Sequence, residues 1–212
     1  STGRYLVPAV GRSLRFYLKK YLHMPWWQRW LTPIERFPGP RELANLQRVA
    51  ALGVSVAEPL AAGAVRRHPC QSLLAVRELE GFMPLHEYIP DRFAGPDTKS
   101  QRDLRRSLTA KLADIARKLH LANLYHCDFY LCHLFIREAP DGSDGFDLVL
   151  IDLMRLKHSR LSRWRVKDLA QLLFSTDLPG ITRTDRLRFF KNYLGLKRLD
   201  AAARRLLRRV QR

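Results

Sequence analysis

A short stretch of the chain, YHCDFYLCHLFI at positions 125–136, gathers the residue types most able to do chemistry. Its chemically active members are His126, Cys127, Asp128, Cys132 and His133. Two imidazoles and two thiolates are the usual ligands of a structural zinc ion, whereas a carboxylate between them is a candidate general base. The same residues also suit plain packing, with the cysteines as small apolar groups and the histidines hydrogen-bonded in the core.

The spacing of these residues argues against zinc. Paired ligands in structural zinc sites are separated by a short turn, because tetrahedral coordination requires the chain to fold back between them. Here the members of each pair are adjacent, as His126-Cys127 and Cys132-His133, and neighbouring side chains of an extended segment point to opposite faces. The general-base interpretation is therefore favoured, and zinc binding and core packing remain as alternatives.

The surroundings of Asp128 favour a catalytic loop. In protein kinases the triplet H-R-D is followed after four residues by Asn; the Asp receives the proton of the attacking hydroxyl and the Asn holds a metal ion. In this chain His126-Cys127-Asp128 is followed at the same spacing by His133. A second acid, Asp152 in LVLIDLMR, ends an apolar strand where a kinase has the metal-binding Asp of D-F-G.

Two upstream residues complete this kinase pattern. A kinase needs a strand lysine for the nucleotide phosphates and a helix glutamate that holds the lysine. Lys19 in FYLKKY lies on a predicted strand, and Glu42 in PRELANLQRV lies in the first turn of a predicted helix. Either residue alone would be read as a solvated surface charge, but four parts in the kinase order are far more informative.

The sequence as a whole resembles the lipopolysaccharide core kinases of Gram-negative bacteria, particularly the heptose kinases. The resemblance rests on YHCDFYLCHLFI, LVLIDLMRLK and SRWRVKDLAQLLFST, and runs from about residue 18 to 176. It implies an α+β, protein-kinase-like two-lobe fold that transfers phosphate from ATP, with Mg²⁺, to a sugar hydroxyl of lipid-linked core oligosaccharide. It also implies a cytoplasmic protein, peripheral at the inner face of the inner membrane.

The same resemblance assigns the roles of individual residues. Asp128 would be the base, Asp152 the magnesium ligand, Lys19 the phosphate contact and Glu42 its anchor. His133 replaces the usual Asn and, as a poor magnesium ligand, would orient Asp128 or a phosphate. Further expected site residues are Asp168, which would brace the catalytic loop, and Glu78 to Glu80, whose backbone would pair with adenine; Cys127 and Cys132 become packing residues.

Two departures from the protein-kinase pattern are visible. No G-x-G-x-x-G precedes Lys19, so the phosphate-covering loop either lies upstream of residue 1, in a truncated N-lobe, or is dispensable. D-L-M stands in place of D-F-G, a change that the lipopolysaccharide kinases share.

The predicted elements are arranged to position these residues. Strands at 4–10 and 13–21, a helix at 40–52 and two more strands predict a small, sheet-rich, nucleotide-binding lobe over residues 1–80. After a linker at 90–100 come a helix at 102–121, a hairpin ending at Asp152, and helices near 163–175, 183–193 and 199–210. They predict a larger helical lobe over residues 81–212 with the catalytic loop and the metal strand.

Composition narrows the choice of partner. The 38 Lys and Arg against 20 Asp and Glu give a net charge of +18, which predicts a polyanionic partner: nucleic acid, anionic membrane or phosphorylated substrate. The three cysteines and the lack of a long apolar run or leader predict a cytosolic protein without a disulfide framework or membrane span. The basic C-terminal segment LKRLDAAARRLLRRVQR and the tryptophans of MPWWQRWL suit either a contact with an anionic membrane or ordinary packing.

Rival functions make different demands on the sequence. A Kdo kinase, or another small-molecule kinase of the same fold, is the first alternative. An aminoglycoside-type kinase acts on cations and would want an acidic cleft, which this basic chain does not favour. A non-catalytic nucleic-acid-binding protein would interleave aromatic and basic residues on one platform, whereas Phe129, Tyr130 and Phe135 belong to the apolar loop pattern. No nucleic-acid partner is therefore expected.

Overall fold

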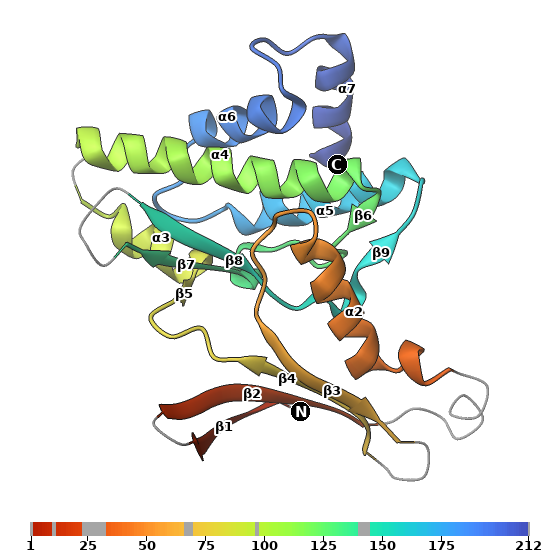
Figure 1. Ribbon diagram of the computed structural model, residues 1–212. Helices are drawn as coiled ribbons and strands as arrows, with labels where there is room; N and C mark the ends of the chain where they lie inside the picture. Colours follow the sequence, from red (N-terminus) through yellow and green to blue (C-terminus); the bar gives the residue numbers. More distant parts are fainter. Residues whose placement is uncertain are drawn as a thin grey trace. The chain divides into compact units, whose positions relative to one another are not determined.

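A computed structural model describes residues 2–9, 12–22, 33–65, 70–95, 98–139 and 145–211 of the chain. These residues form two compact units (Figure 1). The first unit comprises residues 1–80 together with 152–155, and the second comprises 81–151 and 156–212. The first unit thus ends at residue 80, and the structure groups Asp152–Arg155 with it. The tryptophan-rich stretch at 23–32 lies outside the described residues.

The first unit is an antiparallel sheet with one helix packed on it. The strands are β1 (Thr2–Ala9), β2 (Arg12–Leu22), β3 (Pro59–Ala64) and β4 (Cys70–Arg77), in the spatial order β1-β2-β4-β3. Helix α2 (Pro38–Ala50), preceded by the 3₁₀ turn η1 (Ile34–Arg36), contacts β2, β3 and β4. Leu46, Val49 and Leu74 are fully buried between helix and sheet. The two N-terminal strands and the helix predicted from the sequence are confirmed, with the helix starting two residues earlier than expected.

The second unit is mainly helical. Its long helix α4 (Lys99–Leu121) begins at Thr98, whose side chain accepts the N–H of Gln101, and α6 (Arg183–Leu194) runs along it (Figure 1). Helices α5 (Ser162–Ser175) and α7 (Ala201–Val210) pack on each other. The strands are short: β5 (Met83–Pro84), β7 (Leu134–Glu138) and β8 (Phe146–Leu150) form one sheet, and β6 (Leu124–Tyr125) pairs with β9 (Lys157–His158).

One element departs from the sequence prediction. Helix α3 (Leu85–Arg92) occupies a region for which the sequence predicts no helix, and its last residues fall in the predicted linker at 90–100. Pro90 lies inside it, and proline normally marks a helix end. The helix forms because Leu85, Tyr88 and Ile89 share one face and are buried in the unit, so packing outweighs the local propensity.

The two units carry different parts of the expected site. Two further short turns, η2 (Leu131–His133) and η3 (Leu153–Arg155), follow Asp128 and Asp152 respectively.

Among the described residues, no helix is both long enough and apolar enough to cross a membrane.

Candidate active site

Strand β2 presents Lys19 and Tyr21 on the same face of the first unit. Residues two apart on a strand point to the same side of the sheet. The pairing of Lys19 with Thr2 on β1 and with Leu74 on β4 fixes the register, so a central strand carries both side chains. Their position is therefore set by the hydrogen bonds of two neighbouring strands.

The N-terminus of α2 is seated directly on β4. A Cβ atom added to Gly39 would lie 2.2 Å from the carbonyl oxygen of Leu73, so only glycine permits this approach. The N–H of Gly39 also donates to the hydroxyl of Ser72 at 3.1 Å. This close contact brings Glu42, one turn further along the helix, to the residues of β2.

Glu42 is held through both of its carboxylate oxygens. Lys19 Nζ lies 2.7 Å from Oε1, and the hydroxyl of Tyr21 donates to Oε2. The Glu42 side chain is only 1% exposed and that of Lys19 is 20% exposed. Burial, followed by the contact with Glu42, raises the pKa of Tyr21 far above its ordinary value, so the phenol stays protonated and donates. Since a buried carboxylate requires compensating partners, this arrangement fixes the lysine ammonium group.

Asp152 belongs to the same set of charges. Its Oδ1 lies 3.3 Å from Lys19 Nζ, and its side chain is 44% exposed. Its φ of 59° is in the left-handed region that non-glycine residues seldom adopt. Asn45 on α2 donates to the carbonyl oxygen of Leu153 at 2.8 Å, so α2 holds both Glu42 and the turn after Asp152. Sequence reasoning missed Asn45 and Tyr21, although Tyr21 follows Lys19 at the spacing of one strand face.

The expected connector residues Glu78 and Glu80 lie at the end of β4. The N–H of Glu78 donates to the carbonyl of Arg15 at 3.0 Å, and its carboxylate is 2.6 Å from Arg4. Glu80 is exposed, at 3.9 Å from Arg15. The N–H of Glu78 is thus used by β2, and an adenine contact at this segment would need its other backbone groups.

In the second unit, Asp168 on α5 holds the loop that carries Asp128. Its Oδ2 accepts the N–H of His126 and its Oδ1 that of Cys127, both at 2.8 Å, and the side chain is fully buried. Cys127 has a φ of 67°, a strained conformation that these bonds stabilise. Gln171, one turn further, donates to the carbonyl of Cys127 and accepts the N–H of Phe129. The backbone on both sides of Asp128 is therefore fixed by α5.

Both histidines of the loop bind backbone oxygens. His133 Nδ1 lies 2.7 Å from the carbonyl oxygen of Asp128, so Nδ1 carries the proton and donates. His126 Nε2 donates to the carbonyl of Ile151 at 3.0 Å, and the N–H of Ile151 donates to the carbonyl of His133. Ile151 is joined by its peptide bond to Asp152, so the loop is anchored to the residue before the second acid.

These contacts bear on the zinc alternative. Across the described ranges, no group of three or more His, Cys, Asp and Glu side chains is arranged to hold a metal ion. Cys127 is buried, with its Sγ near the carbonyl of Tyr125, and Cys132 is half-buried. Burial, and then the negative charge of Asp168, raise the pKa of the Cys127 thiol, which favours the neutral form over the thiolate that zinc requires.

A further group behind Asp168 was not recognised in the sequence. His120 at the end of α4 lies 3.3 Å from Asp168 Oδ2 through Nε2, and 2.8 Å from the Tyr193 hydroxyl through Nδ1. Arg165 donates to the same hydroxyl at 2.6 Å. Burial raises the pKa of Tyr193 to about 12. The only sequence signal is that these residues lie on the buried faces of three different helices.

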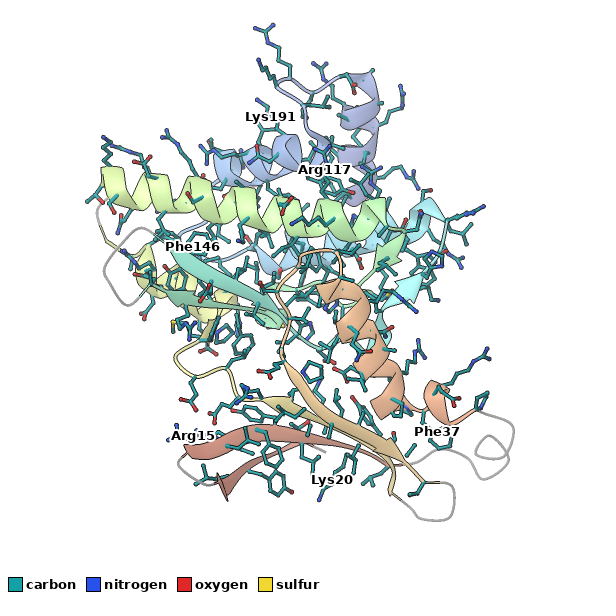
Figure 2. The ribbon with its side chains drawn as sticks, in the orientation of Figure 1. Arg15, Lys20, Phe37, Arg117, Phe146 and Lys191 are labelled. Carbon is teal, nitrogen blue, oxygen red and sulfur yellow. The ribbon has the colours of Figure 1, made fainter. Side chains whose placement is uncertain are left out.

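The second unit also contains an apolar cavity of about 500 Å³. It is lined by leucines and phenylalanines of α3 to α7, with Arg105, Arg183 and Arg186 among its polar members. Basic side chains stand along α4, α6 and α7; Figure 2 labels Arg117 on α4 and Lys191 on α6. Arg204, Arg205, Arg208 and Arg209 of α7 are exposed, whereas its Ala203 and Val210 are buried in the unit.

Together, a strand lysine paired to a helix glutamate and an H-x-D loop braced by a buried aspartate define a protein of the kinase-like class. The match to family sequences agrees: the chain belongs to the lipopolysaccharide kinase (Kdo/WaaP) family, whose profile covers residues 2–193. The fold and family predicted from the sequence are thereby confirmed, and the chain is a kinase of lipopolysaccharide biosynthesis by its family.

Among similar proteins of known function are two lipopolysaccharide core heptose(I) kinases named WaaP. The protein of Escherichia coli K12 is 30% identical over 203 residues, which cover 87% of this chain and 75% of that protein. The protein of Pseudomonas aeruginosa PAO1 is 32% identical over 158 residues, covering 72% of this chain and 58% of that protein. The solved structure of WaaP in complex with acyl carrier protein is similar too. It shows 27% identity and a TM-score of 0.64, over 97% of this chain and 77% of that one.

Proposed function

We propose that this protein transfers the γ-phosphoryl group of ATP, with Mg²⁺, to a heptose hydroxyl of the lipopolysaccharide inner core. The observation that carries the proposal is the set Lys19, Glu42 and Asp152, joined by contacts of 2.7 and 3.3 Å in one unit. A cation held between two acids, one of them exposed, is the arrangement that phosphoryl transfer from a nucleotide needs. The relatives named heptose(I) kinases support the choice of sugar.

Nucleotide binding falls to the first unit in this proposal. Lys19 would contact phosphate oxygens while Glu42 and Tyr21 fix its direction, and the backbone of residues 78–80 would contact adenine. Asp152 suits magnesium because it offers hard carboxylate oxygens on an exposed side chain. When bound there, the ion would neutralise charge on the phosphates. Since a lysine already contacts Oδ1, the carboxylate is oriented before the nucleotide arrives.

Acceptor activation falls to Asp128. Its backbone is fixed by the loop contacts of α5, so the carboxylate is presented from a rigid support, and it would accept the proton of the attacking hydroxyl. His133 donates from Nδ1 to the carbonyl of Asp128 and so orients this residue through its backbone.

Location follows from charge in this proposal. The exposed arginines of α7 would contact anionic lipid at the inner face of the inner membrane, where each basic residue contributes about 1 kcal/mol. The apolar side of α7 packs within the second unit, so this contact would rest on the arginines alone.

A second proposal concerns a protein partner. The similar solved structure is of WaaP with acyl carrier protein, and the apolar cavity of about 500 Å³ has the size and lining that an acyl chain needs. We propose that this chain binds an acylated carrier protein and that the cavity receives the acyl chain. The protein should co-purify with acylated carrier protein and not with the unacylated form. Leu173→Trp, which narrows the cavity, should weaken binding of the acylated carrier protein. Equal retention of both forms would contradict the cavity's part in the contact.

The transfer itself is tested with the purified protein and two acceptors. A lipid A core acceptor that ends in heptose should gain one phosphate, and this gain should require both ATP and Mg²⁺. An otherwise identical acceptor that ends in Kdo should gain none. Transfer to the second acceptor alone would indicate the alternative, a Kdo kinase. No transfer, with a thermal stability that ATP and Mg²⁺ do not raise, would favour a non-catalytic protein.

A further inference from the structure

Three cationic side chains surround Trp164 in the first turn of α5. Lys157 Nζ lies 3.9 Å from the centroid of the indole ring, Arg163 Cζ lies 4.9 Å away and Lys167 Nζ lies 5.8 Å away. Cations within about 6 Å of an aromatic ring are attracted by its electron-rich face. The indole therefore gathers three positive charges at one place, and the half-buried ring itself is held by the unit.

The charges of these three side chains are not neutralised by direct ion pairs among the described residues, although the acids Asp128 and Asp168 act on the same neighbouring residue, Cys127. Within the described part of the chain, neither Lys157, Arg163 nor Lys167 forms an ion pair with a carboxylate. Arg163 and Lys167 are exposed, and Lys157 is half-buried. Three like charges held close together repel one another, and an anionic ligand would relieve this repulsion. The cluster therefore has the character of an anion-binding site rather than of a stabilising surface network.

The cluster lies beside the loop that carries Asp128. Lys157 on β9 is the register partner of Tyr125 on β6, only two positions before Cys127. Trp164 and Lys167 share a helix face with Asp168 and Gln171, because residues spaced by three, four and seven lie on one side of a helix. Asp168 and Gln171 both bind the loop backbone.

Electrostatics agree with this placement. The positive charges of Lys167 and Lys157 both act to lower the pKa of Cys127, against the larger effect of burial that raises it. Two ammonium groups thus lie close enough to act on the residue next to Asp128. None of the four residues of the cluster takes part in the nucleotide contacts proposed above, which are assigned to Lys19, Glu42 and Asp152.

We infer that Trp164, Lys157, Arg163 and Lys167 form the binding site for an acidic group of the acceptor saccharide, a carboxylate or a phosphate on the sugars around the reacting hydroxyl. The inference rests on the proposed function and names the acceptor contacts for it. Lysine and arginine form charge-assisted hydrogen bonds to such anions. The indole holds the lysine head groups in place, and the neighbouring loop then meets a hydroxyl of the same saccharide.

The test uses the double variant Lys157→Gln/Lys167→Gln and a control of equal charge change, Lys111→Gln/Lys197→Gln, at exposed lysines of the same unit. Each protein is assayed with three lipid A core acceptors: intact, with carboxylates reduced to alcohols, and with phosphates removed. With the intact acceptor the double variant should show a KM for acceptor raised about ten-fold, the size of one lost charge-assisted contact. The kcat at saturating acceptor and the KM for ATP should stay within about two-fold.

The modified acceptors identify the anion. If a carboxylate is bound, carboxyl reduction of the acceptor should raise the KM of the wild-type protein as much as the double substitution raises the KM for the intact acceptor. Carboxyl reduction should then raise the KM of the double variant little further. The same pattern with the dephosphorylated acceptor would identify a phosphate. If each modified acceptor raises the KM of the double variant by the same factor as that of the wild-type protein, the inference is overturned. A raised KM for ATP with an unchanged KM for acceptor would also overturn it.

Two further results separate structure from binding and this inference from the proposed function. Lys157→Arg/Lys167→Arg keeps both charges and should restore the KM for acceptor; failure to restore it in a folded protein counts against the site. A wild-type protein that phosphorylates no core acceptor refutes the proposed function. A wild-type protein that does so, beside a double variant that behaves like the control, refutes only the acidic-group site.

Discussion

Asp168 accepts the backbone N–H of Cys127 at 2.8 Å, at a residue whose φ of 67° is unfavourable for any side chain with a Cβ atom. The same carboxylate accepts the N–H of His126. One buried acid thus stabilises the strained backbone directly before Asp128. Its own position is supported by His120 and, through His120, by Tyr193.

Replacing Asp168 by Ala should therefore weaken both the fold and the reaction. Two buried N–H groups would lose their acceptor, so the free energy of unfolding should fall by about 2–4 kcal/mol, and kcat should fall with it. Urea denaturation and steady-state kinetics measure the two effects. Asp114→Asn, at an exposed pair with Lys118 on α4, is the control and should change stability by less than about 0.5 kcal/mol. A stable Asp168→Ala variant with normal turnover would show that α5 does not hold the loop.

The set around Glu42 should behave as one unit. Lys19→Ala and Glu42→Ala should each raise the KM for ATP or lower kcat, and the double variant should lose scarcely more than either single variant, because each change removes the same contact. Asp152→Ala should likewise weaken binding of magnesium and ATP. Losses that simply add would show that Lys19 and Glu42 do not work as a pair.

Tyr21→Phe tests the second partner of Glu42. The phenyl ring keeps the packing but removes the hydroxyl donor, so the KM for ATP should rise by about three- to ten-fold. Tyr17→Phe, on the same strand and the same face, is the matched control and should leave the KM unchanged. An equal effect of both variants would mean that the Tyr21 hydroxyl does not position Glu42.

Much of this arrangement could be predicted from the sequence. The spacing around Asp128, the strand position of Lys19 and the apolar strand before Asp152 are local patterns. The order of these patterns along the chain, with α2 after Lys19 and α5 after Asp152, could also be read from the sequence. Tyr21, Asn45 and His120 could not be found in this way, because their roles come from contacts between distant segments. Helix α3 was missed for the same reason: burial of three side chains outweighs a proline inside it.

The cysteines test the zinc alternative. Protein purified without added metal should contain no stoichiometric zinc by elemental analysis, and Cys127→Ser/Cys132→Ser should show only a modest loss of stability. The pKa of Cys127 is raised, so its thiol stays neutral at neutral pH and its contribution to stability is complete below the ordinary thiol pKa. That contribution declines as the pH rises through the raised value, and alkylation of Cys127 should become appreciable only there. One zinc per chain would reverse this interpretation.

The arginines of α7 should affect location more than chemistry. Replacing Arg204, Arg205, Arg208 and Arg209 by Gln should weaken binding to vesicles that contain anionic lipid, most clearly at low salt, with kcat at saturating acceptor preserved. A control with the same charge change uses Lys99, Lys111, Arg117 and Lys197. Equal vesicle binding by both variants would mean that these arginines only face solvent.

The central claim, that this kinase uses Asp128 to phosphorylate an inner-core heptose, is tested most directly by mass spectrometry of the core oligosaccharide from three strains. One strain lacks the gene, one carries the wild-type gene and one carries the Asp128→Asn variant at equal protein level. Only the wild-type strain should add one phosphate to heptose, because loss of a positioned base lowers transfer by about 10² to 10⁴-fold. Heptose phosphate at the wild-type level in the Asp128→Asn strain, or its presence without the gene, would contradict the account.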